Sequence, residues 1–217
     1  DVSFVIEPGR SIALVGKTGS GKTTIVNLIN RFYNIQKGEI LIDGVNINEI
    51  NLRCLREHIG MILQDPFIFA DSIKENIKMN LPISDEDVKK SIELASAEEF
   101  VNNLPNGINE VAKERGSSFS AGQKQLIAFA RVFAHNPNIF ILDEATANID
   151  TYTESLIQKS INKISEDKTS IFIAHRLSTI VNVDKIIVLM NGEIVEQGKH
   201  KELVDTGGYY SKLYNSY

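Results

Sequence analysis

Apolar residues in this chain gather in short unbroken runs, and between the runs lie segments whose apolar residues recur with helical spacing. Unbroken apolar runs suit strands that are buried on both faces, as in a parallel sheet covered by helices. The runs are residues 12–15, 139–142, 171–174 and 186–189. The helical segments are residues 24–32, 123–133, 153–164 and 209–214. This alternation predicts an α/β fold with a mainly parallel sheet flanked by helices.

The middle of the chain is expected to be mainly helical. The expected helices are residues 72–78, 85–96 and 97–103. Ser84 suits the N-cap of the second helix, and Asp87 completes a capping-box pattern three residues later. We therefore expect one domain over residues 1–217, with a helical subdomain inserted in a core. The subdomain would span about residues 67–128, and the core about residues 1–66 and 129–217.

Both ends of the chain carry strand patterns. Asn191 and Gly192 lie between residues 187–190 and 193–196 and predict a two-residue turn of a β-hairpin. Residues 1–9 alternate like a strand already in progress, and no initiating Met precedes them. We therefore expect a fragment of a longer protein that lacks its first strands.

Composition narrows the class of protein. The chain has 217 residues, of which 42% are hydrophobic and 24% charged, as expected of a soluble globular protein. Its net charge of −5 argues against a surface that coats nucleic acid. No apolar stretch approaches the ~18–20 residues that span a bilayer. Cys54 is the single cysteine, so no internal disulfide can form, and a reducing compartment is expected.

A glycine-rich motif links the first apolar run to the helical segment that follows. Its residues are Gly16, Lys17, Thr18, Gly19, Ser20, Gly21, Lys22 and Thr23, with Thr24 directly after them. In a strand–turn–helix context, backbone N–H groups close around phosphate oxygens and the helix N-terminus adds its positive dipole end. Lys22 is expected to reach the β- and γ-phosphates, and the Thr23 hydroxyl to bind Mg²⁺. The alternative, a turn that binds nothing, fits this context less well than a nucleoside triphosphate site.

Acidic residues end the second apolar run, and a histidine ends the third. Asp143 and Glu144 follow the strand at 139–142, and the carboxyl end of a parallel strand faces the ligand crevice. Asp143 can hold the Mg²⁺ shared with Thr23, and Glu144 can orient and deprotonate the attacking water. His175 is expected at the same edge, facing phosphate. A solvated strand end and a structural histidine are the simpler alternatives.

A second helix start offers another surface for an anion. Ser120, Gly122 and Gln123 lie at the beginning of the helix expected over residues 123–133. Small residues, a hydroxyl and a helix N-terminus together favour anion binding. Taken alone, the same residues make only a well-capped helix.

These motifs resemble those of the ATP-binding-cassette (ABC) ATPase family, over essentially the whole chain. Residues 119–123 are similar to the family's signature motif, and residues 147–150 to its D-loop, which ends here in Asp150. Gln64 resembles the Q-loop glutamine, which contacts Mg²⁺ and the water, and His175 resembles the switch histidine, which contacts the γ-phosphate. The resemblance implies a P-loop NTPase core, an α-helical subdomain that carries the signature motif, and ATP and Mg²⁺ as ligands.

Within that family the chain is most similar to the exporter branch. The stretches that carry this similarity are residues 31–33, 71–77, 114–116 and 174–179. Residues 114–116 resemble the exporter segment that touches the coupling helices of a transmembrane domain, although Lys113 stands where a glycine is usual. The resemblance implies a place at the cytoplasmic face of a cell membrane, as part of a transporter, with no nucleic acid as partner.

The resemblance also implies a head-to-tail pair of nucleotide-binding domains, either homodimeric or heterodimeric. Each ATP would lie between the phosphate loop of one domain and the signature motif of the other. Ser120 and Gly122 would serve the partner's nucleotide, whereas Lys22, Asp143 and Glu144 would serve the chain's own. The pair would close when ATP binds and open after hydrolysis. Attached membrane helices would convert this cycle into alternating access.

Three further positions depart from the family pattern, and several functions stay open. The usual signature leucine and first glycine are Phe119 and Ala121, and the usual D-loop serine is Ala147. We expect the ATP-hydrolysing nucleotide-binding domain of an ABC exporter. The alternatives are an importer ATPase subunit, a soluble ABC protein acting on DNA or ribosomes, and a regulatory cassette that binds ATP without hydrolysing it.

Overall fold

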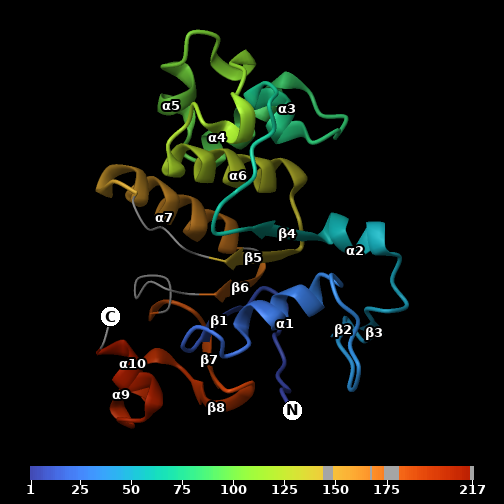
Figure 1. Cartoon of the computed structure of the whole chain (residues 1–217), viewed down its shortest axis with the longest axis vertical. Coiled ribbons are helices and arrows are strands. Elements are labelled where there is room, and N and C mark those ends of the chain that lie inside the picture. The colour runs from blue at the N-terminus through green and yellow to red at the C-terminus, as the bar shows by residue number, and fades with distance from the viewer. Residues whose placement is uncertain (144–148, 167, 174–180, 216–217) are drawn as a thin grey trace. The chain divides into compact units, whose positions relative to one another are not determined.

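The structure of the chain is a computed structural model that describes residues 1–143, 149–166, 168–173 and 181–215 (Figure 1). The chain divides into two compact units. The first unit comprises residues 1–60, 138–144 and 168–217, and the second comprises residues 61–137 and 145–167.

A six-stranded sheet organises the first unit, in the order β4-β5-β6-β1-β7-β8. The strands are β1 (Ser11–Val15), β4 (Ile59–Ile62), β5 (Ile139–Asp143), β6 (Thr169–Ile173), β7 (Lys185–Met190) and β8 (Glu193–Gly198). β1 pairs in parallel with β6 and β7, and β5 pairs in parallel with β6, whereas β7 and β8 are antiparallel. The mainly parallel sheet and the hairpin at Asn191 and Gly192 are both confirmed.

The apolar runs form the centre of this sheet because both faces of the strands are buried. Leu14, Ile141 and Ile187 are fully buried on three different strands. Phe140 of β5 and Phe172 of β6 pack edge to face, with ring centroids 6.2 Å apart. Among the described residues, the predicted site residues of this unit lie at the end of β1, at the start of the helix that follows β1 and at the end of β5.

Helices and a small hairpin complete the first unit. The helices are α1 (Lys22–Ile29), α2 (Leu52–His58), α9 (His200–Asp205) and α10 (Tyr209–Tyr214), and the hairpin consists of β2 (Leu41–Ile42) and β3 (Val45–Asn46). Both C-terminal helices lie beside β8 (Figure 1). The Glu196 carboxylate of β8 accepts the Tyr210 backbone N–H at 2.9 Å and so holds the start of α10.

Two local predictions for this unit were wrong. The first helix ends at Ile29 rather than at residue 32, because Arg31 turns to a left-handed φ of 50°. The N–H groups of Arg31 and Phe32 then donate to the carbonyls of Leu28 and Asn27, a Schellman arrangement that closes a helix. Residues 1–9 form no strand, because no described strand pairs with them.

The second unit is helical. Its helices are α3 (Ile73–Lys78), α4 (Asp85–Leu94), α5 (Glu98–Asn102), α6 (Ala121–His135) and α7 (Thr151–Ser165), with 3₁₀ turns at Gly107–Asn109 and Glu114–Gly116. α6 packs against α3, α4 and α7 and buries Leu126 and Phe129. The predicted capping box of α4 is confirmed. The Asp87 N–H donates to Ser84 Oγ at 3.1 Å, and the Ser84 N–H donates to the Asp87 carboxylate at 3.0 Å.

Candidate functional site

The glycine-rich motif joins β1 to α1, and its lysine folds back over the loop. Lys22 Nζ donates hydrogen bonds to the carbonyl oxygens of Gly16 at 2.6 Å and Lys17 at 3.1 Å. Only 5% of Lys22 is exposed. Burial lowers the pKa of its ammonium, and the negative charge of Asp143 opposes that shift. Because burial disfavours the charged ammonium, an anionic ligand beside Lys22 would stabilise it.

Two glycines let the loop close tightly. A Cβ on Gly16 would lie 2.3 Å from the carbonyl oxygen of Leu189 and 2.6 Å from Ser20 Oγ, so no side chain fits there. Gly21 has a φ of 106° and precedes α1, which begins without a side-chain cap. The first N–H groups of α1 are thus not bound by a capping side chain, and an anion can take that place.

Ser20 supplies an observation that points directly to a ligand. Its Oγ is buried and has no hydrogen-bond partner in the described part of the chain. Leaving a buried hydroxyl unpaired costs about 1–3 kcal/mol. The backbone of Ser20 is fixed, since its N–H donates to the Lys17 carbonyl and its carbonyl accepts from the Gly192 N–H, both at 3.1 Å. A phosphate oxygen would satisfy this hydroxyl, so the loop fits a polyphosphate.

Oxygen ligands for a divalent cation lie at the same edge of the sheet. Asp143 ends β5, half-buried, and its charge acts on Lys22. Thr23 and Thr24 are exposed on the first turn of α1. A hydroxyl and a carboxylate are ligands that Mg²⁺ accepts together with phosphate oxygens. Within the described residues, no group of three or more His, Cys, Asp or Glu side chains could hold a metal ion.

Of the three predicted catalytic residues Glu144, His175 and Gln64, the first two lie outside the described residues. The same holds for Ala147 of the predicted D-loop. Their roles stay predictions that rest on the sequence.

In the second unit, the predicted signature segment begins α6 with a complete capping box. The Ser120 hydroxyl accepts the Gln123 N–H at 3.2 Å, and Gln123 Oε1 accepts the Ser120 N–H at 2.9 Å. Ser120 is exposed, whereas Gly122 is buried. Both readings of this segment are therefore compatible with the structure, because a capped helix start still presents an exposed hydroxyl.

Gln64 follows β4 and is exposed, and a residue that the sequence did not single out holds its backbone. Gln125 of α6 is 3% exposed, and its Nε2 donates to the Gln64 carbonyl oxygen at 3.2 Å. The helix of the signature segment thus fixes the backbone of the predicted Q-loop glutamine. A polar residue inside an apolar helical pattern was the available signal for Gln125.

Asp150 is the N-cap of α7. Its carboxylate accepts the Thr153 N–H at 2.9 Å. The backbone N–H and the hydroxyl of Thr153 hold the pKa of Asp150 below its ordinary value. The predicted D-loop aspartate therefore fixes the start of a helix in this unit.

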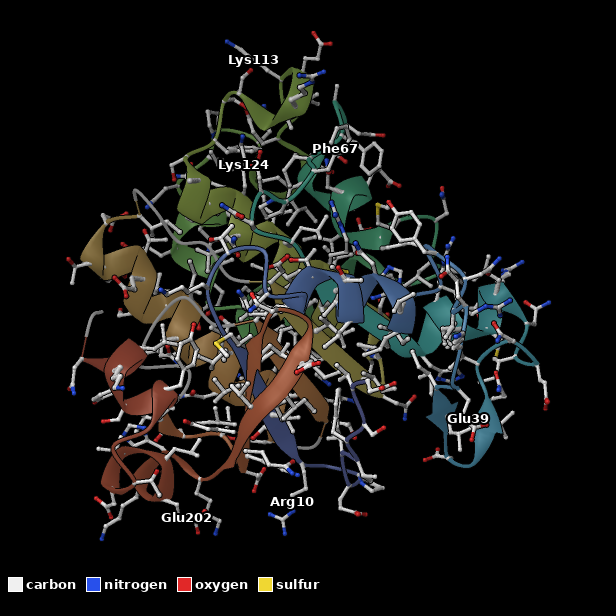
Figure 2. The ribbon with its side chains drawn as sticks, turned by 60° about the horizontal axis from the view of Figure 1, so that its bottom comes forward. Arg10, Glu39, Phe67, Lys113, Lys124 and Glu202 are labelled. Atoms are coloured by element: carbon white, nitrogen blue, oxygen red, sulfur yellow. The ribbon has the colours of Figure 1, made fainter. Side chains whose placement is uncertain are left out.

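The second unit also exposes an aromatic pair. Phe67 and Phe69 are 55% and 45% exposed and pack edge to face with centroids 4.9 Å apart. Figure 2 labels Phe67 together with Lys113 and Lys124 of the same unit. Solvent-exposed aromatic rings that pack on each other are typical of a surface that binds another protein.

The predicted site residues divide between the two units. Lys22 and its loop lie with Thr23 and Asp143 in the first unit. The second unit contains Gln64, Ser120, Gly122, Gln123 and Asp150. Within each unit, these residues lie at or near the ends of strands and the starts of helices.

Comparison with known proteins identifies the family. Residues 1–147 match the model of the ABC transporter family. The chain is 49% identical to the putative ABC transporter ATP-binding protein exp8 of Streptococcus pneumoniae, over 99% of this chain and 37% of that protein. It is 48% identical to the probable multidrug resistance ABC transporter ATP-binding/permease protein YheH of Bacillus subtilis, over 98% of this chain and 32% of that protein.

A solved structure agrees with these relatives. The structure of a bacterial Atm1-family ABC exporter with ATP bound matches with a TM-score of 0.92 and 38% identity, over 99% of this chain and 38% of that one. The chain therefore belongs to the ABC transporter family and is a nucleotide-binding domain of the exporter type. It spans about a third of the length of these relatives. Among the described residues, no helix is both long and apolar enough to cross a membrane.

Proposed function

We propose that the chain binds ATP with Mg²⁺ and hydrolyses it. The observation that carries this proposal is the unpaired buried hydroxyl of Ser20, in the same loop as the buried ammonium of Lys22. Lys22 would exchange its hydrogen bonds to the Gly16 and Lys17 carbonyls for bonds to β- and γ-phosphate oxygens. The Ser20 hydroxyl would donate a hydrogen bond to another phosphate oxygen. Backbone N–H groups of residues 16–24 would bind the remaining oxygens.

Thr23 and Asp143 are the proposed metal ligands in the first unit, and Gln64 is proposed to join them when nucleotide is bound. When bound, Mg²⁺ neutralises charge on the phosphate oxygens. Glu144 would take the proton of the attacking water, and His175 would contact the γ-phosphate.

Replacing Glu144 by Gln tests the hydrolysis. The change keeps the size of the side chain but removes the base, so phosphate release should fall at least about 100-fold while ATP affinity stays within about threefold. Glu39→Gln, at an exposed carboxylate of the first unit, is the matched control and should leave both unchanged. Undiminished turnover of Glu144→Gln would show that another group is the base. A wild-type protein that binds ATP but releases no phosphate would favour the regulatory cassette.

The proposed working form is a head-to-tail pair of nucleotide-binding domains, formed by two copies or by two related chains. Ser120, Gly122, Gln123 and Asp150 would face the nucleotide held by the partner's phosphate loop. The exposed Ser120 hydroxyl and the N-terminus of α6 support this, because both can bind an anion from outside the chain.

A transmembrane domain is the second proposed partner. Its coupling helices would dock on the second unit near Phe67, Phe69 and residues 114–116. The exposed aromatic edge supports this docking surface, as do relatives described as ATP-binding/permease proteins. The chain would then work as one cassette domain at the cytoplasmic face of a membrane, with its helical subdomain at about residues 67–128.

A further inference from the structure

The first turns of α6 and α7 touch at Gly122. A Cβ on Gly122 would lie 2.3 Å from Thr153 Cγ2, 3.2 Å from Thr153 Cβ and 3.2 Å from Ile149 Cγ2. Carbon atoms that are not bonded pack at about 3.5–4.0 Å. Even a methyl group at this position would therefore force α6 and the start of α7 apart. All three residues belong to the second unit.

Thr153 uses both branches of its side chain at this contact. Its methyl group faces Gly122. Its backbone N–H donates to the carboxylate of Asp150, the residue that caps α7, at 2.9 Å, and its hydroxyl is close enough to help lower the pKa of that carboxylate. A β-branched side chain in a helix has little freedom at χ1. Turning the methyl away from position 122 would also move the hydroxyl away from Asp150, so the methyl cannot easily yield.

We propose that Thr153 is a positioning residue that fastens the segment capped by Asp150 to the signature helix. Through Thr153, the helix start that carries Ser120 and the helix start capped by Asp150 keep a fixed spacing. This inference rests on the proposed function, in which both segments face the nucleotide of a partner domain. The two segments then approach or leave that nucleotide as one body.

Packing against Thr153 therefore requires a glycine at position 122, independently of any contact that Gly122 makes with nucleotide. A side chain at position 122 would disturb the Asp150 cap from inside the chain, even without ATP. The damage should then depend on the methyl group of Thr153, which can be removed while its hydroxyl is kept. Thr153→Ser makes that change, whereas Thr153→Val keeps a methyl group and removes the hydroxyl.

The test compares Gly122→Ala alone with Gly122→Ala/Thr153→Ser and Gly122→Ala/Thr153→Val, in the full-length protein that contains this chain. In nucleotide-free protein, hydrogen exchange of the Thr153 amide should speed up about tenfold in Gly122→Ala. ATP hydrolysis should fall about tenfold in the same variant. Adding Thr153→Ser should return both readouts to within about threefold of wild type, because the two positions are coupled. Thr153→Val should restore neither, and Thr153→Ser alone should lower hydrolysis by up to about threefold, because it removes the methyl contact between the two helix starts.

Two results would overturn the inference. One is unchanged exchange of the Thr153 amide in Gly122→Ala, and the other is a defect that Thr153→Ser does not relieve. If Gly122→Ala does not fold, recovery of folded protein by Thr153→Ser but not by Thr153→Val supports the inference, and failure of both overturns it. A wild-type protein without ATP hydrolysis would instead contradict the proposed function, while the exchange measurement would still decide the role of Thr153.

Discussion

Single residues in the first unit show how burial changes acid–base chemistry, and Tyr210 shows it most strongly. Tyr210 is 1% exposed, and its hydroxyl lies 2.8 Å from Nδ1 of His200. Burial raises the pKa of Tyr210 to about 12, and the neighbouring Tyr214 adds to the rise. The folded protein thus holds the phenol proton more tightly than the unfolded chain does.

This difference predicts how stability changes at alkaline pH. The folded pKa lies above the ordinary value of 10.0, so the stabilising contribution is complete below pH 10 and is lost as the pH rises through about 12. The free energy of unfolding, measured by urea denaturation, should fall more steeply over this range in wild type than in Tyr210→Phe. Tyr33→Phe, at a 65% exposed ring, should behave as wild type. Equal slopes in wild type and Tyr210→Phe would contradict the prediction.

The sequence predicted the residues of the phosphate loop because its requirements are local. Eight consecutive residues contain both the glycines that form the turn and the positively charged Lys22. It could not predict that Ser20 Oγ would be unpaired or that Gln125 would hold Gln64. Those facts depend on which distant segments pack together. A polar residue in an apolar helical pattern marks Gln125, but it does not identify the partner.

At the scale of elements, a buried amide and a guanidinium shape the segment that carries the exposed aromatic pair. Asn76 of α3 is 1% exposed; its Oδ1 accepts the Phe69 N–H at 2.8 Å, and its Nδ2 donates to the carbonyls of Phe69 and Ser72 at 3.0 Å. Arg131 of α6 donates from Nε to the Asn76 carbonyl at 2.8 Å and from Nη2 to the Phe67 carbonyl at 3.2 Å. Two helices thus hold one loop by its backbone.

Asn76→Ala should therefore destabilise the second unit without touching the phosphate loop. Truncation removes the partner of the Phe69 N–H and one of the bonds to each of the Phe69 and Ser72 carbonyls, so the free energy of unfolding should drop by about 1–3 kcal/mol in a chemical denaturation experiment. Asn102→Ala, at an exposed position of α5, is the control and should stay within about 0.5 kcal/mol of wild type. A drop of equal size in both variants would mean that the amide of Asn76 has no special role.

The start of α4, which two side chains set, was predicted correctly, and the end of α1, which the backbone conformation sets, was not. The Ser84 and Asp87 capping box could be seen in the sequence, because both partners lie within four residues. The end of α1 could not be predicted, because it depends on the left-handed conformation of Arg31. A glycine or asparagine at that position would have indicated a helix end. An arginine has no local preference for positive φ, so the surrounding structure sets this conformation.

At the scale of the whole molecule, the predicted site residues are distributed over both units. The first unit carries the loop that would hold the chain's own ATP, and the second carries Gln64 together with the segments proposed to serve a partner's ATP. Sequence motifs indicated a fold and a family that the comparisons confirm. No motif in one chain can show a site completed by a second chain, because the two halves never meet within it.

Mixing two defective variants tests this composite site. Lys22→Met removes the cation from the phosphate loop but keeps a normal signature segment. Ser120→Asp keeps a good N-cap for α6 but places a negative charge toward the partner's phosphates. Each variant alone should be inactive as a homodimer. In a heterodimer of the two, one site combines both defects, and the other combines an intact loop with an intact signature segment.

An equimolar mixture that exchanges subunits freely should therefore regain ATP hydrolysis. With random pairing half of the dimers are mixed, and each has one intact site of two, so the rate should approach about a quarter of that of wild type. Steady-state phosphate release against mixing ratio measures this, with a maximum at equal amounts. A site completed within one chain predicts no recovery at any ratio, because every chain in the mixture carries a defect in its own site.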